Sequence, residues 1–249
     1  MANRVGSSPR GFPKGAATQK ILGYPRGVGV PPELPPFEGY TAWYDFSQED
    51  SVLLSGTTVQ RIFDKSENDH DLFTLTGTLV MDGTRMMNGV VVPDWSSDGM
   101  VAFFDMVVPP YAWMFVISVD SIGNQNLFNY VGGGEYMMRM TNPPSMVRVG
   151  TSGVALSGVN LPTDSPMVFG ATREVGSGTM WFMFGDNWQG INVSGQATPT
   201  TGAATRIGTR ISSEHYDGIW GECLYYPESF SRHEMTKLAN YFRRKWGAH

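Results

Sequence analysis

The chain has 249 residues, of which only 16% are charged and 12% are aromatic, and it contains 30 glycines and 16 prolines. This composition is typical of an all-β protein rich in turns, and a chain of this length can bury a full core without a metal or a disulfide. The single cysteine, Cys223, excludes an intrachain disulfide, and the most apolar stretch, 101–119, is broken by Asp105 and two prolines, which excludes a membrane-spanning helix there. We therefore expect a soluble protein made in a reducing cytoplasm.

The net charge of −5 is divided unevenly along the chain. Residues 1–32 hold five basic residues and no acidic one, whereas the rest holds 13 basic and 23 acidic residues, a balance of −10. Residues 1–37 are rich in glycine and proline, and their apolar residues follow neither the strand period of 2 nor the helix period of 3.6. The sequence predicts an extended basic arm over 1–37, which is either a leader without a role or a segment that binds a neighbouring subunit. We favour binding, through these side chains: Arg4, Arg10, Phe12, Lys14, Lys20, Ile21, Leu22, Tyr24 and Arg26.

Residues 38–249 are predicted to form one β domain. Short runs rich in Val, Phe, Tyr, Trp and Met alternate with turn signals such as Asn88-Gly89, Asp98-Gly99 and Asp217-Gly218. Because such pairs permit the positive φ of tight hairpins, we expect antiparallel strands in a sandwich or barrel. The strands are predicted over 41–46, 59–63, 89–93, 100–104, 113–119, 126–131, 136–140, 146–150, 167–173, 179–184, 190–194, 205–208 and 218–226.

One helix is predicted at the end of the domain, over 232–246. Ser231 and Glu234 form a Ser-x-x-Glu capping box, in which each side chain bonds a backbone N–H that the helix leaves without a partner. The apolar residues that follow recur with helical spacing and form one face, and Gly247 ends the helix. We expect that face to dock on the sandwich.

Two segments carry a family resemblance. The segment 41–47 reads Thr-Ala-Trp-Tyr-Asp-Phe-Ser and continues through the predicted turn Asp64-Lys65-Ser66, while 216–247 contains Gly-Glu-Cys-Leu-Tyr and ends in Lys-Trp-Gly. They resemble the opening and closing motifs of the concanavalin A-like, laminin-G-like domains of bacteriophage and bacterial surface proteins, although Phe63 and Glu67 stand where the family has Trp and Gly. The resemblance implies a concanavalin A-like jelly roll. It also implies a choice among sugar binders, adhesion modules, enzyme domains and virion parts.

The sequence offers no catalytic set. No strand carries acidic residues at i and i+2, and neither a Gly-x-Ser-x-Gly nucleophile motif nor His-Cys zinc spacing is present. Glu222, inside an apolar strand, is predicted to satisfy backbone donors or to pair with a base. We therefore expect no enzymatic activity and no cofactor. Calcium binding is left as an alternative to ordinary turn roles for Asp120, Asp186, Asn187 and Asp217.

Two main functions remain, with an orphan hydrolase domain as a third option. The arm, the resemblance and the missing catalytic set favour a bacteriophage virion structural protein, such as a capsid decoration or tail accessory subunit. We expect it to bind other virion proteins and copies of itself, to touch neither nucleic acid nor membrane, and to assemble in the bacterial cytoplasm.

The alternative is a carbohydrate-binding adhesin or receptor-binding module of the virion. Sugars stack on exposed aromatic rings, and the candidate residues are Trp188, Asp186, Asn187 and Trp95. The competing interpretation is that both tryptophans are partly buried residues at the rim of the core.

Overall fold

The structure, a computed structural model, describes residues 34–47, 50–102, 109–123, 125–131, 138–141, 146–147, 162–194, 204–208 and 215–249. All but one of its elements are strands. They are β1 (Ala42–Asp45), β2 (Val52–Ser55), β3 (Thr58–Ile62), β4 (Leu72–Thr76), β5 (Met86–Met87), β6 (Val90–Val91), β7 (Asp94–Ala102), β8 (Tyr111–Val119), β9 (Gln125–Val131), β10 (Met138–Thr141), β11 (Met146–Val147), β12 (Met167–Arg173), β13 (Thr179–Phe184), β14 (Asn187–Asn192), β15 (Ala204–Ile207) and β16 (Tyr216–Tyr226), followed by α1 (Arg232–Trp246).

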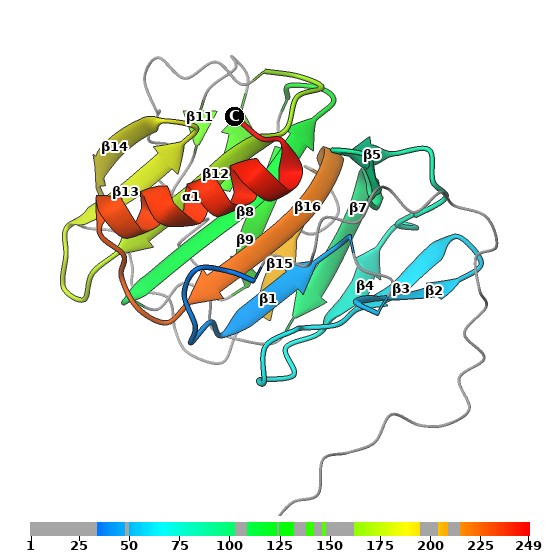
Figure 1. The fold of residues 1–249 in the computed structure, drawn as a ribbon, viewed down its shortest axis with the longest axis horizontal. Coiled ribbons are helices and arrows are strands. Elements are labelled where there is room, and N and C mark those ends of the chain that lie inside the picture. Colours follow the sequence, from blue (N-terminus) through cyan, green and yellow to red (C-terminus); the bar gives the residue numbers. More distant parts are fainter. Residues whose placement is uncertain are drawn as a thin grey trace, which may run out of the picture.

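The strands other than β5 and β6 form one continuous antiparallel sheet that folds over into two layers (Figure 1). One layer has the order β1-β16-β8-β12-β13-β14, and the other has the order β2-β3-β4-β7-β15-β9-β10-β11. Strand β7 joins them, because its first half pairs with β16 while Met100 and the two residues after it pair with β15. The protein is thus an antiparallel β-sandwich with a C-terminal helix, as the sequence predicts.

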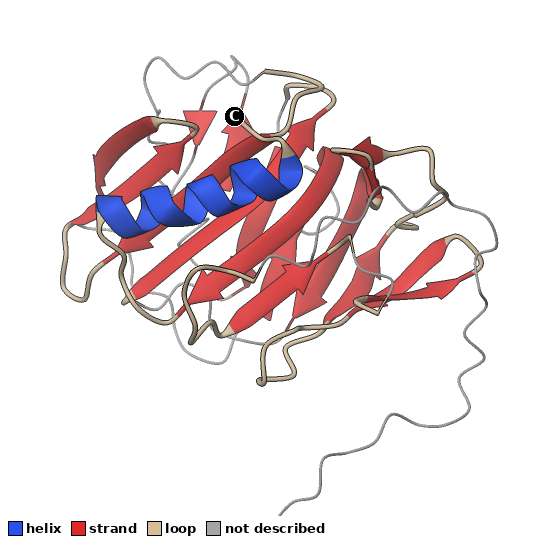
Figure 2. Ribbon diagram, in the orientation of Figure 1, coloured by secondary structure: helices blue, strands red, loops and turns tan. Residues whose placement is uncertain are grey.

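Strand β8 shows how the core is divided. All nine of its residues are buried, and alternate side chains enter different clusters. Trp113, Phe115 and Ile117 face the space between the two layers, whereas Met114 and Val116 face the cluster under α1. Because successive side chains of a strand point to opposite faces, this strand is covered on both sides. Figure 2 shows the helix lying across the outer face of this layer.

Helix α1 begins and ends where its local signals predict. The N–H of Ser231 donates to Glu234 Oε2 at 2.8 Å, the Ser231 hydroxyl accepts from the N–H of Glu234, and Gly247 adopts a φ of 63° that ends the helix. The buried face carries Met235, Leu238 and their neighbours onto β12 and β8. No helix in the described part of the chain is long and apolar enough to cross a membrane.

A buried ionic cluster fixes the helix to the strands. Lys245 Nζ lies 2.7 Å from both Asp45 Oδ2 and Glu222 Oε2, and both carboxylates are fully buried. Glu222 also accepts hydrogen bonds from the Trp43 indole (2.7 Å), the Tyr241 hydroxyl (2.7 Å) and the Trp246 indole (2.9 Å). Burial raises the pKa of Glu222, and the Lys245 ammonium opposes that shift. Glu222 therefore pairs with a base, one of its two predicted roles, and the other three donors named here are also side chains. The Lys-Trp-Gly ending of the chain supplies two of these partners.

Three features of the sequence prediction need correction. The pairs Asp98-Gly99 and Asp217-Gly218 were predicted as turns, but they lie inside β7 and β16, beside a β-bulge. Gly218 packs so closely on the Ser118 carbonyl that no Cβ would fit there. Phe37, assigned to the arm, packs on Tyr226 and Phe230, so the folded domain begins at or before this residue.

Candidate functional site

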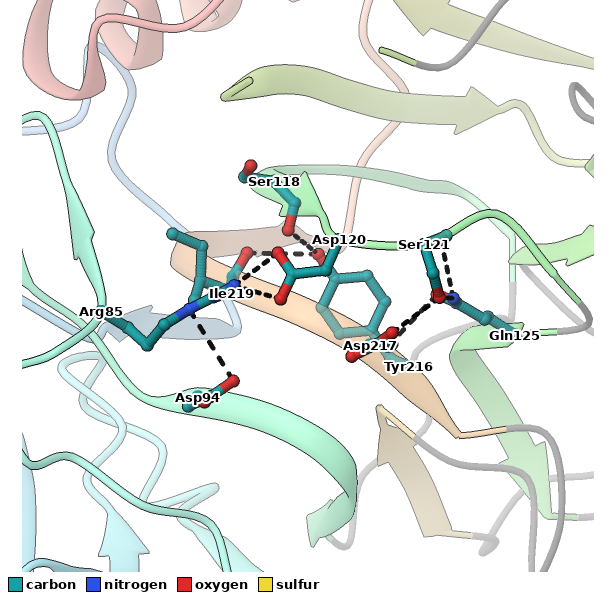
Figure 3. A network of polar contacts seen from close by, with 9 residues as sticks. All are labelled: Arg85, Asp94, Ser118, Asp120, Ser121, Gln125, Tyr216, Asp217 and Ile219. Carbon is teal, nitrogen blue, oxygen red and sulfur yellow. Dashed lines mark hydrogen bonds and ion pairs between the residues drawn. The ribbon is translucent and has the colours of Figure 1, made fainter. Parts of the chain in front are cut away.

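A polar network lies where β8 ends and where β7 and β16 begin (Figure 3). The Arg85 guanidinium bonds both carboxylate oxygens of Asp120, and its Nε lies 3.8 Å from Asp94 Oδ1. These three side chains are each about one quarter to one third exposed. Partial burial raises the pKa of Asp94, and Arg85 opposes the rise. The positive charge of one guanidinium thus compensates the negative charges of two neighbouring carboxylates at a half-buried site.

The same network continues along the loop after β8. The Ser121 hydroxyl donates to Asp217 Oδ2 at 2.6 Å, and Gln125 Nε2 donates to the Ser121 carbonyl at 2.8 Å. The hydroxyl of buried Tyr216 donates to the Ser118 carbonyl at 2.7 Å. These polar groups form hydrogen bonds with one another, so the arrangement stabilises the end of the sandwich. It leaves few donors and acceptors available to a ligand.

The network bears on the candidate calcium ligands. Asp120 and Asp217 both belong to it, but Arg85 occupies the oxygens of Asp120. Asp186 and Asn187 lie elsewhere, in the β13–β14 hairpin. Within the described ranges, no group of three or more His, Cys, Asp or Glu side chains is placed to hold a metal ion.

The seven tryptophans fall into two groups by exposure. Trp181 is 42% exposed and Trp188 is partly buried. Their rings stack on each other, with centroids 5.5 Å apart and planes 9° apart. The other five lie in the core and are at most 5% exposed: Trp43, Trp95, Trp113, Trp220 and Trp246. The two tryptophans that reach solvent therefore form one surface.

The β13–β14 hairpin builds this surface through its register. Trp181 lies opposite Gly190, and Trp188 lies opposite Met183, so the two tryptophans are diagonal neighbours on one face. The turn begins at Gly185, whose φ is 53°. A Cβ on Gly190 would lie only 3.0 Å from the six-membered ring of Trp181, so the glycine lets this indole lie over the neighbouring strand.

The hairpin face that carries the two rings is the face that α1 partly covers. Met183, on this face of β13, belongs to the cluster under the helix, and Trp188 packs against the same cluster. Met180 and Phe182 point the other way, into the core between the layers. Trp181 stands two residues farther from the turn than Met183 and is exposed there.

The strand residues that register places beside the two rings are uncharged. Register places Thr179 opposite Asn192 on the same face, and Thr172 of β12 opposite Trp181. The Asn192 side-chain oxygen accepts from the Ser194 N–H at 2.9 Å, which orients the amide. At the turn, the exposed Asp186 is bonded by Arg243 of α1 at 2.7 Å.

The structure places the predicted sugar-binding residues as follows. Trp188 lies in β14 and is partly buried against the cluster under α1, as the rim interpretation expects, while part of its ring reaches solvent. Asp186 and Asn187 are exposed beside it. The prediction that Trp95 is an exposed platform is wrong, because its ring is fully buried between Phe46 and Trp220 in the core. The predicted contacts of the arm, from Arg4 to Arg26, lie outside the described residues.

Sequence reasoning missed Trp181. In β13 five of six residues are apolar, so the strand shows no polar face that would mark which side reaches water. The available signal was the short Gly185-Asp186 turn, since a two-residue hairpin loop fixes the register and brings Trp181 next to Trp188.

Comparisons with known proteins show the fold. No protein-family model matches the chain, and no curated protein matches its sequence. Among solved structures, the chain is similar to domain 4 of AbnA, a GH43 extracellular arabinanase from Geobacillus stearothermophilus, in complex with arabinotriose. The two are 12% identical with a TM-score of 0.62, and the match covers 81% of this chain and 98% of that domain.

Two further structures are similar over most of this chain. A GH54 α-L-arabinofuranosidase is 12% identical with a TM-score of 0.57, over 84% of this chain and 60% of that one. The receptor-binding domain of a botulinum neurotoxin C/D mosaic serotype is 9% identical with a TM-score of 0.57, over 81% of this chain and 51% of that one. This chain thus spans about half to three fifths of those two proteins. At these identities the likeness shows a β-sandwich alone, and the narrower resemblance to phage domains stays a prediction.

Proposed function

We propose that this domain is a non-catalytic carbohydrate-binding module, with Trp181 and Trp188 as the surface on which sugar rings stack. The observation that carries the proposal is the stacked pair itself. A tryptophan that is 42% exposed leaves a large apolar area in water, and burying such area is favourable by about 25 cal/mol per Å². A ligand that covers the ring would recover this free energy.

The chemistry of the pair suits a sugar. Indole rings have electron-rich faces, which attract the weakly positive C–H groups on one side of a sugar ring. The hydroxyls of the same sugar need hydrogen-bond partners around the ring, and Thr179 and Asn192 offer a hydroxyl and an amide there. An apolar platform with a few polar neighbours is the usual form of a small-molecule site.

The similar structures add support of a general kind. The arabinanase domain was solved with arabinotriose, and a sialidase from Trypanosoma rangeli, with a TM-score of 0.52 and 10% identity, was solved with sialic acid. β-Sandwiches of this shape therefore occur in proteins that bind sugars. This favours the carbohydrate-binding alternative over the virion structural role, for which these proteins offer no parallel.

Two pairs of neighbouring carboxylates are engaged with basic side chains, which supports a binding role without catalysis. Retaining and inverting glycosidases need two carboxyl groups facing a sugar. Here Asp45 and Glu222 are fully buried with Lys245, and Asp94 and Asp120 share Arg85. Neither pair lies in the β13–β14 hairpin.

The proposal is tested by screening the protein on a glycan array that includes arabinotriose, and by repeating the screen with Trp181→Ala. Loss of a tryptophan at the centre of a binding surface should weaken affinity at least about tenfold. Phe73→Ala is the matched control, because Phe73 is 41% exposed but lies on β4 in the other layer. Thermal unfolding should confirm that both variants fold. Absence of any glycan binding by the wild-type protein, or equal binding by Trp181→Ala, would contradict the proposal.

A further inference from the structure

The stacked pair also carries information about the charge of its ligand. The 5.5 Å between ring centroids exceeds the roughly 3.5–4.0 Å of carbon–carbon contact, so the two nearly parallel rings are laterally offset. Each ring therefore keeps part of a face that the other does not cover. A ligand on this surface meets electron-rich ring faces first.

The groups that register places around the two rings on this face are uncharged. They are Thr172, Thr179, Gly190 and Asn192. Thr172 Oγ1 already accepts a hydrogen bond from the N–H of Phe230 at 2.8 Å. A carboxylate of a sialic or uronic acid laid on this surface would lose water and find no ionic partner among these residues.

The cations at the two ends of the hairpin are already engaged. Arg243 bonds Asp186 at 2.7 Å and the Asn240 side chain at 3.0 Å. Arg173, where β12 ends, donates to the Ser177 carbonyl at 3.4 Å. Recruiting either arginine for an acidic sugar would require breaking bonds that it makes within the protein.

Resting on the proposed function, we infer that the β13–β14 hairpin selects uncharged saccharides and discriminates against glycans whose stacked ring carries a carboxylate. The physical reasons are the negative electrostatic potential of the indole faces and the uncharged strand residues that register places around the pair. The affinity for an uncharged saccharide should also be independent of salt, because its binding involves no ion pair for salt to screen.

The experiment compares matched probes by titration calorimetry with the full-length protein. The pairs are lactose with sialyllactose, and a linear gluco-oligosaccharide with the same oligosaccharide ending in a uronic acid; arabinotriose serves as a further neutral probe. The neutral members that bind should do so at least about tenfold more tightly than their acidic partners, and their affinity should not change between about 0.05 and about 0.5 M salt. Trp181→Ala should abolish this binding and Phe73→Ala should not.

The outcomes separate the two proposals. Acidic members that bind as tightly as neutral ones, with binding that depends on Trp181, would overturn the inference and leave the proposed function standing. Binding that falls steeply with salt would overturn the inference in the same way. No binding of any probe here and none on the array, or binding that Trp181→Ala leaves intact, would overturn both.

Discussion

Replacement of Lys245 by methionine tests the buried ionic cluster that holds α1. Methionine keeps an unbranched apolar side chain of similar length and removes the charge together with the hydrogen bonds that the ammonium donates. Lys245 Nζ lies 2.7 Å from both Asp45 and Glu222, so the change leaves two fully buried carboxylates without this ammonium. The hydrogen bonds from the Trp43 and Trp246 indoles to Glu222 remain.

The expected cost follows from these contacts. Removing one partner of a buried ion pair typically costs about 3–5 kcal/mol, because the other charge stays buried without compensation. Here two carboxylates lose their cation, which raises the cost, while the Lys245 side chain is 12% exposed, which lets water reach the position. We therefore expect a loss of about 3 kcal/mol in the free energy of unfolding.

The measurement is urea unfolding followed by tryptophan fluorescence, with Lys237→Met as the control. Lys237 is exposed on the same helix, so its replacement should change stability by no more than about 0.5 kcal/mol. In Lys245→Met, burial raises the folded pKa of Glu222 above its unfolded value without the opposing effect of the Lys245 ammonium. Protonation of a carboxyl group with a raised folded pKa stabilises the folded variant at acidic pH, and this stabilisation is lost as the pH rises. The difference in free energy of unfolding between the variant and the wild type should therefore narrow as the pH falls toward about 4. Equal effects of the two variants would refute the argument, as would a gap that is independent of pH.

Three further predictions concern the helix and the arm. Trp246→Ala should destabilise the fold by about 3–5 kcal/mol in the same assay, because the ring is buried and bonded to Glu222; an unchanged midpoint would show that the helix is peripheral. Ser231→Ala should cost about 1 kcal/mol through loss of the capping box. The Ser231 hydrogen bonds lower the pKa of Glu234, so this stabilisation is present above the unfolded pKa and lost as the pH falls through the lowered folded value; unfolding measured at several acidic pH values should show a weaker pH dependence in the variant. Deleting residues 1–32 should leave thermal unfolding nearly unchanged but reduce assembly into oligomers or particles, as sedimentation would show, and normal assembly would leave the arm a passive leader.

Local signals predicted their own elements well. Helix α1 and strands β12 and β13 have the predicted bounds, because a capping box, an αL glycine and continuous apolar runs depend on few residues. The Asn88-Gly89 turn between β5 and β6 also has the predicted positive φ at both residues. The fold class followed from the number and spacing of such runs.

The missed strands lack these signals. In β4 the residues Phe73, Thr74 and Leu75 are all exposed, so no alternation marks the strand. The first half of β7 is polar because Asp98 is satisfied inside the fold, where its Oδ1 accepts from the Thr78 N–H at 2.6 Å. Such partners are distant in sequence, and no window of residues contains them.

The candidate site was predictable only in part. Of the two tryptophans that the sequence offered as exposed candidates, only Trp188 reaches solvent. The exposure of Trp181 and the burial of Trp95 depend on which faces the helix and the second layer cover. That information arises from the packing of elements far apart in the chain and is absent from the local pattern.

The carbohydrate-binding proposal is tested most directly by NMR of the tryptophan indole N–H groups during titration with a neutral oligosaccharide. The chain has seven tryptophans, so seven indole signals are expected, and Trp181→Phe and Trp188→Phe assign the two of interest. The proposal predicts saturable shifts of the Trp181 and Trp188 signals, with the five buried indoles nearly unchanged. No shift at a saturating concentration of any glycan bound on the array, or shifts confined to other tryptophans, would contradict it.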